Sequence, residues 1–168
     1  QRAGLEGEAL IKALAVLDSK GLLMDPESQT EPHKQPFAWP TELLASIGLD
    51  PADRGLLATV KALKPTVLIG TSGQPGAFGE EVIRELASHV ERPLVFPFSN
   101  PTSKCEATPA DVLNWTGGKA LIATGSPFEP VDFEGRTIRT SQGNNVYIFP
   151  GVGLGAMVAN ASQVSDAM

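Results

Sequence analysis

The 168-residue sequence holds few of the residues that build disulfide or metal frameworks. Its single cysteine is Cys105, so no disulfide can form within the chain and a cysteine zinc cluster is excluded. The two histidines, His33 and His89, lie far apart in the sequence, which disfavours a His-rich metal site. One unpaired cysteine fits a reducing compartment, so we expect a cytoplasmic location.

Positive charge and long apolar runs are scarce as well. The formal net charge is −6, which disfavours nucleic acid or an anionic membrane surface as a general partner. No apolar run reaches the roughly 18 residues that a membrane helix needs. The first ten residues lack the apolar region of a secretory signal. We therefore expect neither nucleic acid nor a membrane as a partner.

The composition is that of a folded domain. Hydrophobic residues make up 42% of the chain and charged residues 19%, which supports a buried core and argues against disorder. The length indicates one domain over residues 1–168.

Apolar strand patterns alternate with helix patterns along the chain. Residues 66–70 form a β-branched strand pattern, and Glu80 to His89 form a helix pattern with acids in its first turn. The segments "RPLVFP" and "ALIAT" repeat the strand pattern, and "LAVLD" predicts a short strand that ends at Asp18. Further helices are predicted near residues 8–14 and 41–47, after Asp50 as N-cap with Pro51 next, and after Thr108 as N-cap. This order predicts an α/β, Rossmann-like, doubly wound and mostly parallel sheet that is covered on both faces.

The last part of the chain predicts a β-hairpin around Glu134-Gly135, a strand over residues 145–151 and a final helix from Leu154 to Met168. Gly151 to Ala156 fit G-x-G-x-x-A, a dinucleotide fingerprint. That fingerprint needs a following βαβ unit and an acid about 20 residues further on, and this segment is followed by one helix and only Asp166. We therefore interpret these glycines as a tight strand-to-helix turn.

Several polar segments follow predicted strands, where parallel sheets bind ligands. They are the loop from Thr71 to Gly79, the "SNPTSK" segment with Asn100, the turn from Gly125 to Pro127, and the amides Asn144 and Asn145. Each has a plain alternative, since Gly, Asn and Pro also form turns. Asp18 is either an ordinary surface acid or the ribose acid of a fingerprint whose glycine turn precedes Gln1.

Three long segments carry a family resemblance. "VLIGTSGQPGAFGEEVIRELASHVERPLVFPFSNPTSKCEATPADVLNW", "ALIATGSPFEPV" and "GNNVYIFPGVGLGA" closely resemble the cofactor-binding domain of malic enzymes, and "VLDSKGLL" and "HKQPFA" match in the same order. The resemblance implies NAD or NADP as cofactor and malate or pyruvate as the small-molecule substrate. It also implies oxidative decarboxylation of malate to pyruvate and CO2 with Mg²⁺ or Mn²⁺, and we expect a homo-oligomer.

The resemblance also assigns residues. The expected cofactor-binding residues are Asp18, Ser19, Gly70, Thr71, Ser72, Gly73, Asn100 and Asn144. The expected substrate-binding residues are Asn100, Asn144 and Asn145. An acid at Asp18 favours NAD because it would repel a 2′-phosphate, whereas Lys20 nearby weakens that preference.

The family's catalytic Tyr and Lys, its metal-binding carboxylates and its first strand with the glycine-rich turn precede the region that matches. We therefore expect an incomplete cofactor domain, truncated at both ends, with no catalytic or metal-binding residue in this chain and no malate decarboxylation by it alone. A non-catalytic nucleotide-binding module, or an interaction module that uses the sheet edge left by the missing strand, is the alternative.

Overall fold

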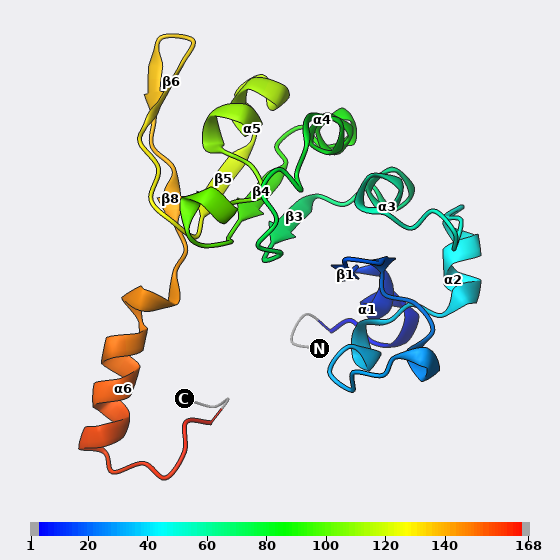
Figure 1. The fold of residues 1–168 in the computed structure, drawn as a ribbon, viewed down its shortest axis with the longest axis horizontal. Helices are drawn as coiled ribbons and strands as arrows, with labels where there is room; N and C mark the ends of the chain where they lie inside the picture. The colour runs from blue at the N-terminus through cyan, green and yellow to red at the C-terminus, as the bar shows by residue number, and fades with distance from the viewer. Residues whose placement is uncertain (1–3, 166–168) are drawn as a thin grey trace.

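A four-stranded parallel sheet lies at the centre of the computed structural model, which describes residues 4–165 (Figure 1). Its strands are β3 (Val67–Gly70), β4 (Leu94–Pro97), β5 (Leu121–Thr124) and β8 (Ser141–Gln142), in the order β3-β4-β5-β8. Val67 pairs with Leu94, and Leu94 pairs with Leu121. The predicted parallel α/β fold is thus confirmed, in the incomplete form expected.

Three helices cover one face of this sheet, namely α3 (Leu56–Leu63), α4 (Glu80–His89) and α5 (Pro109–Thr116) (Figure 1). Alternate strand residues, Leu68 and Val95, point into the core beneath them. The helices contribute mainly Val60, Val82, Ile83, Leu86 and Val112. Side chains alternate across a strand, so one apolar row of each strand is buried here.

The other face of the sheet is not covered by helices of residues 4–165. Ile69 is 59% exposed and Leu121 is 44% exposed, although both are apolar strand residues. The expected two-sided cover is therefore met on one face only within the part of the chain that the structure describes. Strands with apolar side chains on both faces are typical of a sheet that lies between two layers of helices.

The N-terminal segment forms a second, smaller core beside α3. It contains α1 (Gly7–Lys12), the antiparallel pair β1 (Leu17–Asp18) and β2 (Gly21–Leu22), the short 3-10 helices η1 (Pro26–Ser28) and η2 (Gln35–Phe37), and α2 (Thr41–Ser46). Trp39 is fully buried among Leu22, Leu44 and Leu49, and its indole N–H donates to the Leu14 carbonyl over 3.1 Å. The strand predicted up to Asp18 therefore exists only as the pair Leu17–Asp18, and it belongs to this small sheet.

Helix starts were predicted with mixed success. Thr108 is the N-cap of α5 as expected, because its hydroxyl oxygen accepts the Asp111 N–H over 3.2 Å. Asp50 is not an N-cap: α3 begins at Leu56 with Gly55 as its N-cap. The Asp50 carboxylate accepts the Ala52 N–H over 2.8 Å instead, which is a local turn that competes with helix capping.

The C-terminal segment contradicts the prediction after residue 144. The hairpin of β6 (Val131–Phe133) and β7 (Arg136–Ile138) is confirmed, but residues 145–151 are not a strand. They form the 3-10 helix η4 (Asn145–Tyr147) and the start of α6 (Phe149–Val158), while the strand that pairs with β5 is the earlier Ser141–Gln142. The predicted turn glycines therefore lie inside α6, and residues 166–168 of the predicted final helix lie outside the described residues.

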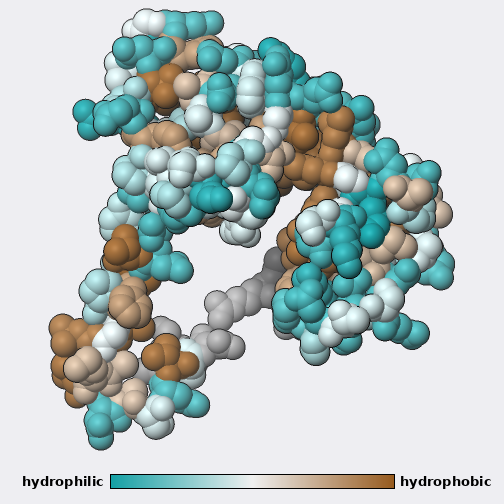
Figure 2. All heavy atoms as spheres, in the orientation of Figure 1, coloured by the Kyte–Doolittle hydropathy of each residue, from teal (hydrophilic) through white to brown (hydrophobic). Residues whose placement is uncertain are grey.

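The helix α6 stands apart from the sheet as an apolar arm (Figure 1). None of its residues is buried, and Phe149 and Met157 are 71% and 79% exposed. Figure 2 shows hydrophobic side chains gathered on this arm, at the lower left. Within residues 4–165, no helix is both long enough and apolar enough to cross a membrane.

Candidate nucleotide site at the carboxyl edge of the sheet

Glu106 joins the two loops that follow β3 and β4. Its side chain is fully buried just before α5. Oε1 accepts the Ser72 backbone N–H over 2.7 Å, the Ser72 hydroxyl over 2.8 Å and the Ser99 hydroxyl. Oε2 accepts the Ser99 backbone N–H over 3.4 Å. One carboxylate therefore holds two loops that the sequence assigns to the cofactor.

The lack of a side chain at Gly70 makes room for this carboxylate. A Cβ at Gly70 would lie 2.6 Å from Cδ of Glu106, far closer than real contacts allow. The loop continues with Gly73, whose N–H donates to the Ser99 hydroxyl oxygen over 2.8 Å. Gly70, Ser72 and Gly73 are therefore brought together with Ser99, and the exposed Thr71 lies between them.

Glu106 is an anion in this setting. Burial of the carboxyl group raises its pKa, but the hydrogen bonds from Ser99 and Ser72 lower it by more, so the net pKa falls below the ordinary value. Cys105 next to it is buried, and burial raises the pKa of its thiol, so that side chain is a neutral thiol.

Asn100 and Asn144 meet around the loop after β5. The Ser126 hydroxyl donates to Oδ1 of Asn100, and Nδ2 of Asn144 donates to the Gly125 carbonyl over 2.9 Å. Nε2 of Gln142 donates to the same carbonyl over 3.1 Å. Gly125 cannot carry a side chain here, because a Cβ would lie 2.1 Å from the Phe98 carbonyl oxygen. The two predicted amides are therefore parts of one polar edge, across the ends of β4, β5 and β8.

Asn145 lies at the rim of this edge. Asn145 is exposed and is the first residue of η4. Asn144 is the N-cap of η4, and Oδ1 of Asn144 accepts the Val146 N–H over 3.0 Å. Asn144 therefore uses both ends of its amide locally, one on Gly125 and one on η4.

Asp18 is the last residue of β1 and Ser19 begins the turn to β2, both outside the parallel sheet. The Asp18 carboxylate accepts the Lys20 backbone N–H over 2.8 Å and the Lys34 ammonium over 3.0 Å. The Lys20 hydrogen bond, followed by the Lys34 interaction, lowers the pKa of Asp18 below its ordinary value. Among the described residues, no hydrogen bond joins this turn to the Glu106 or Asn100 groups.

Glu106 was not expected from the sequence, whereas Ser126 lies in the turn from Gly125 to Pro127, one of the segments that follow predicted strands. Glu106 stands in "SKCEATP", between Cys105 and Ala107 and two residues before the N-cap Thr108 of α5, where an acid resembles an ordinary helix-start residue. Ser126 stands in "TGSP", a common turn composition. Cys105, Glu106 and Ala107 are buried next to one another, and this burial is known only from the fold.

The residues that could hold a metal ion are not present as a group. Among residues 4–165, no cluster of three or more His, Cys, Asp or Glu side chains has the arrangement a metal ion needs. The side chains described here therefore do not fit a divalent cation, and we assign them no metal-dependent step. A dinucleotide fits better, since the polar edge offers amides, hydroxyls and exposed glycine backbone.

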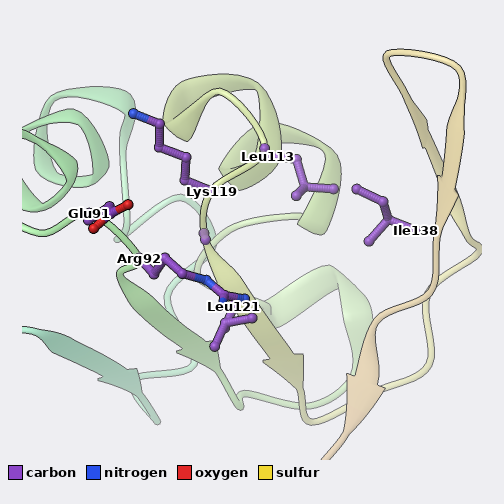
Figure 3. Close-up of a pocket in the computed structure, with 8 residues that line it drawn as sticks. Glu91, Arg92, Leu113, Lys119, Leu121 and Ile138 are labelled. Carbon is purple, nitrogen blue, oxygen red and sulfur yellow. The ribbon is translucent and has the colours of Figure 1, made fainter.

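A hollow of about 390 Å³ lies at the opposite end of the sheet (Figure 3). Leu113 from α5 and Ile138 from β7 point toward each other across it, and Arg92, Lys119 and Leu121 line it near the start of β5 (Figure 3). It contains none of the predicted site residues and lies at the amino ends of the strands, whereas ligands of such sheets bind at the carboxyl ends. We therefore place the candidate site at the polar edge.

Comparisons with known proteins identify the family of this chain. The family model described as "Malic enzyme, NAD binding domain" matches residues 1–168. An NAD-dependent malic enzyme of Sodalis glossinidius (strain morsitans) is 48% identical over 165 residues, which is 98% of this chain and 29% of that protein. NAD-dependent malic enzymes of Shewanella sp. (strain MR-4) and Shewanella frigidimarina are each 47% identical, with the same coverage. The chain thus spans 29% of the length of these relatives.

The parallel sheet, the polar edge where its strands end, and the match along all 168 residues lead to one conclusion: this chain belongs to the malic enzyme NAD-binding domain family.

Proposed function

We propose that residues 1–168 bind NAD at the carboxyl edge of the β3-β4-β5-β8 sheet, as the cofactor part of an enzyme that converts malate to pyruvate and CO2. The observation that carries the proposal is the polar edge itself. Glu106 and Ser99 hold the loop after β3, and Asn100, Ser126 and Asn144 meet around Gly125. The relatives are named NAD-dependent malic enzymes, and the conversion of malate is what the resemblance to that family implies.

Each predicted site residue has a proposed role. The backbone from Gly70 to Gly73 approaches the cofactor closely. Gly73 has a positive φ of 65°, and a Cβ there would meet nothing within 4 Å, so the loop is open to a ligand. Asn100 and Asn144 hold the nicotinamide side of the cofactor and malate, and Asn145 contacts malate or the ribose from the rim.

Asp18 and Ser19 are proposed to hold the adenosine ribose. An ionised carboxylate has about four acceptor positions, and Lys20 and Lys34 occupy two of them. The carboxylate can therefore still accept from ribose hydroxyls. The 2′-phosphate of NADP would face the same carboxylate anion, so we propose NAD rather than NADP. The positive charges of Lys20 and Lys34 reduce the difference in affinity between the two cofactors.

Isothermal titration of the full-length gene product with NAD and with NADP tests both proposals. We expect NAD to bind at least about tenfold more tightly, a difference of about 1.4 kcal/mol. Asn100→Ala should weaken NAD binding, whereas the matched exposed variant Asn114→Ala, on α5, should not. Equal binding of NAD to wild type and Asn100→Ala would contradict the assignment of the polar edge.

The divalent ion and the proton-transfer groups are proposed to come from outside residues 1–168. If the whole enzyme holds Mg²⁺ or Mn²⁺, that ion would supply Lewis-acid catalysis, and the residues that hold it would lie outside residues 1–168. We expect residues 1–168 alone to form no NADH or NADPH from malate and Mn²⁺, and turnover by this piece would refute the proposal.

We further propose that residues 1–168 form one domain of a cytoplasmic homo-oligomer that uses neither nucleic acid nor a membrane as partner. The negative charge and the exposed apolar surface support this.

A second candidate is an interaction module without catalysis. The specific observation that favours it is the exposed apolar arm α6. Cofactor titration discriminates the two, because an interaction module binds neither NAD nor NADP.

A further inference from the structure

Among the residues that the structure describes, the Glu106 carboxylate has no cationic partner to explain its burial. No lysine or arginine of residues 4–165 forms a salt bridge with it, and its side chain is fully buried. Burying a lone carboxylate is costly unless hydrogen bonds replace its hydration. Here four donors from two serines do so. The proposed roles of the site residues leave this charge without a function.

Glu106 contacts both ends of the glycine-rich loop. Its carboxylate accepts from Ser72 near the loop's start, and its backbone carbonyl accepts the Phe78 N–H over 3.1 Å near the loop's end. The same carboxylate accepts from Ser99, which directly precedes Asn100. One residue therefore connects the start and end of one loop with the start of the other.

The negative charge also sets the direction of a hydrogen-bond relay. The Ser99 hydroxyl donates to Glu106, so its oxygen lone pairs are free to accept the Gly73 N–H over 2.8 Å. The Ser72 hydroxyl likewise donates to Glu106 and accepts the Gln74 N–H over 3.1 Å. An acceptor-only carboxylate fixes both hydroxyls in this direction, and thereby the backbone from Gly73 to Gln74.

We propose that Glu106 is a positioning residue whose carboxylate holds the loop from Thr71 to Gly79 and the segment at Ser99-Asn100 in the arrangement that receives the dinucleotide. The inference rests on the proposed function, since it takes these loops as the cofactor loops. Glu106 does not touch the cofactor, and it acts through Ser72 and Ser99.

An amide cannot replace this carboxylate. Glutamine has the same shape but turns one acceptor oxygen into a donor NH2. Whichever way the glutamine amide is turned, its NH2 group faces the backbone N–H of Ser72 or of Ser99, so two donors meet. The serine hydroxyls are then free to reverse the direction of their hydrogen bonds. Aspartate keeps the charge but is one methylene shorter. Glu106→Gln thus changes the hydrogen bonding at constant volume, and Glu106→Asp changes the reach at constant charge.

The test uses the full-length gene product with Glu106→Gln, Glu106→Asp and the matched control Thr116→Val. Thr116 is also buried, and its hydroxyl donates to the Val112 carbonyl within α5 over 2.7 Å, away from the loops. The first readout is cofactor use, measured as the dissociation constant of NAD and as the KM and kcat of turnover. The second readout is amide hydrogen exchange over residues 72–79 without ligand.

We expect Glu106→Gln to weaken NAD binding at least about tenfold, which is about 1.4 kcal/mol. KM for NAD should rise more than kcat falls, and exchange at Gly73 and Gln74 should accelerate. Thr116→Val should lower the melting temperature without either change. If Glu106→Gln does not fold, Ser99→Ala replaces it, and weaker NAD binding with faster exchange at Gly73 is expected from that variant.

The outcomes separate this inference from the proposed function. If wild type does not bind NAD, the proposed function fails and the cofactor role of Glu106 is overturned with it. Faster loop exchange in Glu106→Gln would then show only that Glu106 holds the loop. If wild type binds NAD and Glu106→Gln changes neither binding nor exchange, the inference fails while the function stands. Equal loss of binding in Thr116→Val would show a general effect of stability and would also overturn it.

Discussion

Two glycines at strand ends decide the geometry of the site, because each allows a close approach that a side chain would block. Gly70 admits the Glu106 carboxylate, and Gly125 admits the Phe98 carbonyl. Neither has a positive φ, so close packing and not a special backbone conformation accounts for them.

Gly70→Ala should therefore destabilise the protein by about 1–3 kcal/mol, the usual range for overpacking, because its Cβ meets Glu106. Urea unfolding measures the change. Gly155→Ala, in α6, is the control and should not destabilise the protein, since its Cβ would meet nothing within 4 Å. A Gly70→Ala variant as stable as wild type would show that Glu106 moves aside freely.

The pH dependence of stability should follow the two carboxylates with lowered pKa values, Glu106 and Asp18. Each has a lower pKa folded than unfolded, so the unfolded chain binds more protons in acid. Their stabilisation is fully present above the ordinary values of 4.5 and 3.8, and it is lost as the pH falls through the lower folded values.

Urea unfolding of wild type between about pH 7 and about pH 3 should show this loss, and Glu106→Gln should reduce the slope. Asp18 is more exposed than Glu106, so solvent screens its share and Asp18→Asn should change the slope less. An unchanged slope in Glu106→Gln would contradict the assignment of this carboxylate as a buried anion.

At the scale of elements, α6 shows how an apolar segment with glycines can be misread. The run from Tyr147 to Ala156 matches a strand followed by a turn, yet residues 149–158 form a helix. Asn144 caps the preceding η4, and Pro150 occupies the first turn of α6, where its missing N–H costs nothing. Hydropathy alone does not distinguish a strand from a helix in this segment, and the capping residues decide for the helix.

Replacing Gly151, Gly153 and Gly155 by alanine should stabilise α6. Each Cβ would meet nothing within 4 Å, and alanine favours the helix interior by about 0.5–1 kcal/mol per site. Far-ultraviolet circular dichroism should show increased helicity relative to wild type. Alanine in a strand-to-turn segment would instead leave helicity unchanged, which is the result that would contradict α6.

At the scale of the whole molecule, two apolar surfaces of residues 4–165 face solvent: the open side of the sheet, with Ile69 and Leu121, and the arm α6, on which Figure 2 shows hydrophobic side chains. Contiguous apolar surface of this kind marks an interface. Residues 1–168 alone should therefore elute above their monomer mass in size-exclusion chromatography and bind a hydrophobic dye.

The double variant Phe149→Ser and Met157→Ser should shift elution toward the monomer, because both side chains are largely exposed. The exposed variant Glu81→Gln, on α4, serves as the control. A clean monomer of the wild-type residues 1–168 would contradict the proposed association.

Much of the fold could be predicted because it is local. The strand at Val67–Gly70, the helix Glu80–His89, the cap at Thr108 and the hairpin at Glu134-Gly135 each follow from residues within a few positions of one another. The start of α3 and the end of the sheet were predicted wrongly, because a turn at Asp50 and a cap at Asn144 compete with the patterns there.

The sequence by itself determined the parallel α/β order of elements, the family, and the loops that follow each strand, because periodicity, capping and motifs are written in neighbouring residues. Only the tertiary structure decided that Ser72, Ser99 and Glu106 meet, that Asn100 and Asn144 share one edge, and that Asp18 pairs with Lys34 away from both. Within each group these contacts join residues that lie 7 to 34 positions apart in the sequence. At the polar edge, only the packing of parallel strands brings the carboxyl ends of β3, β4, β5 and β8 together.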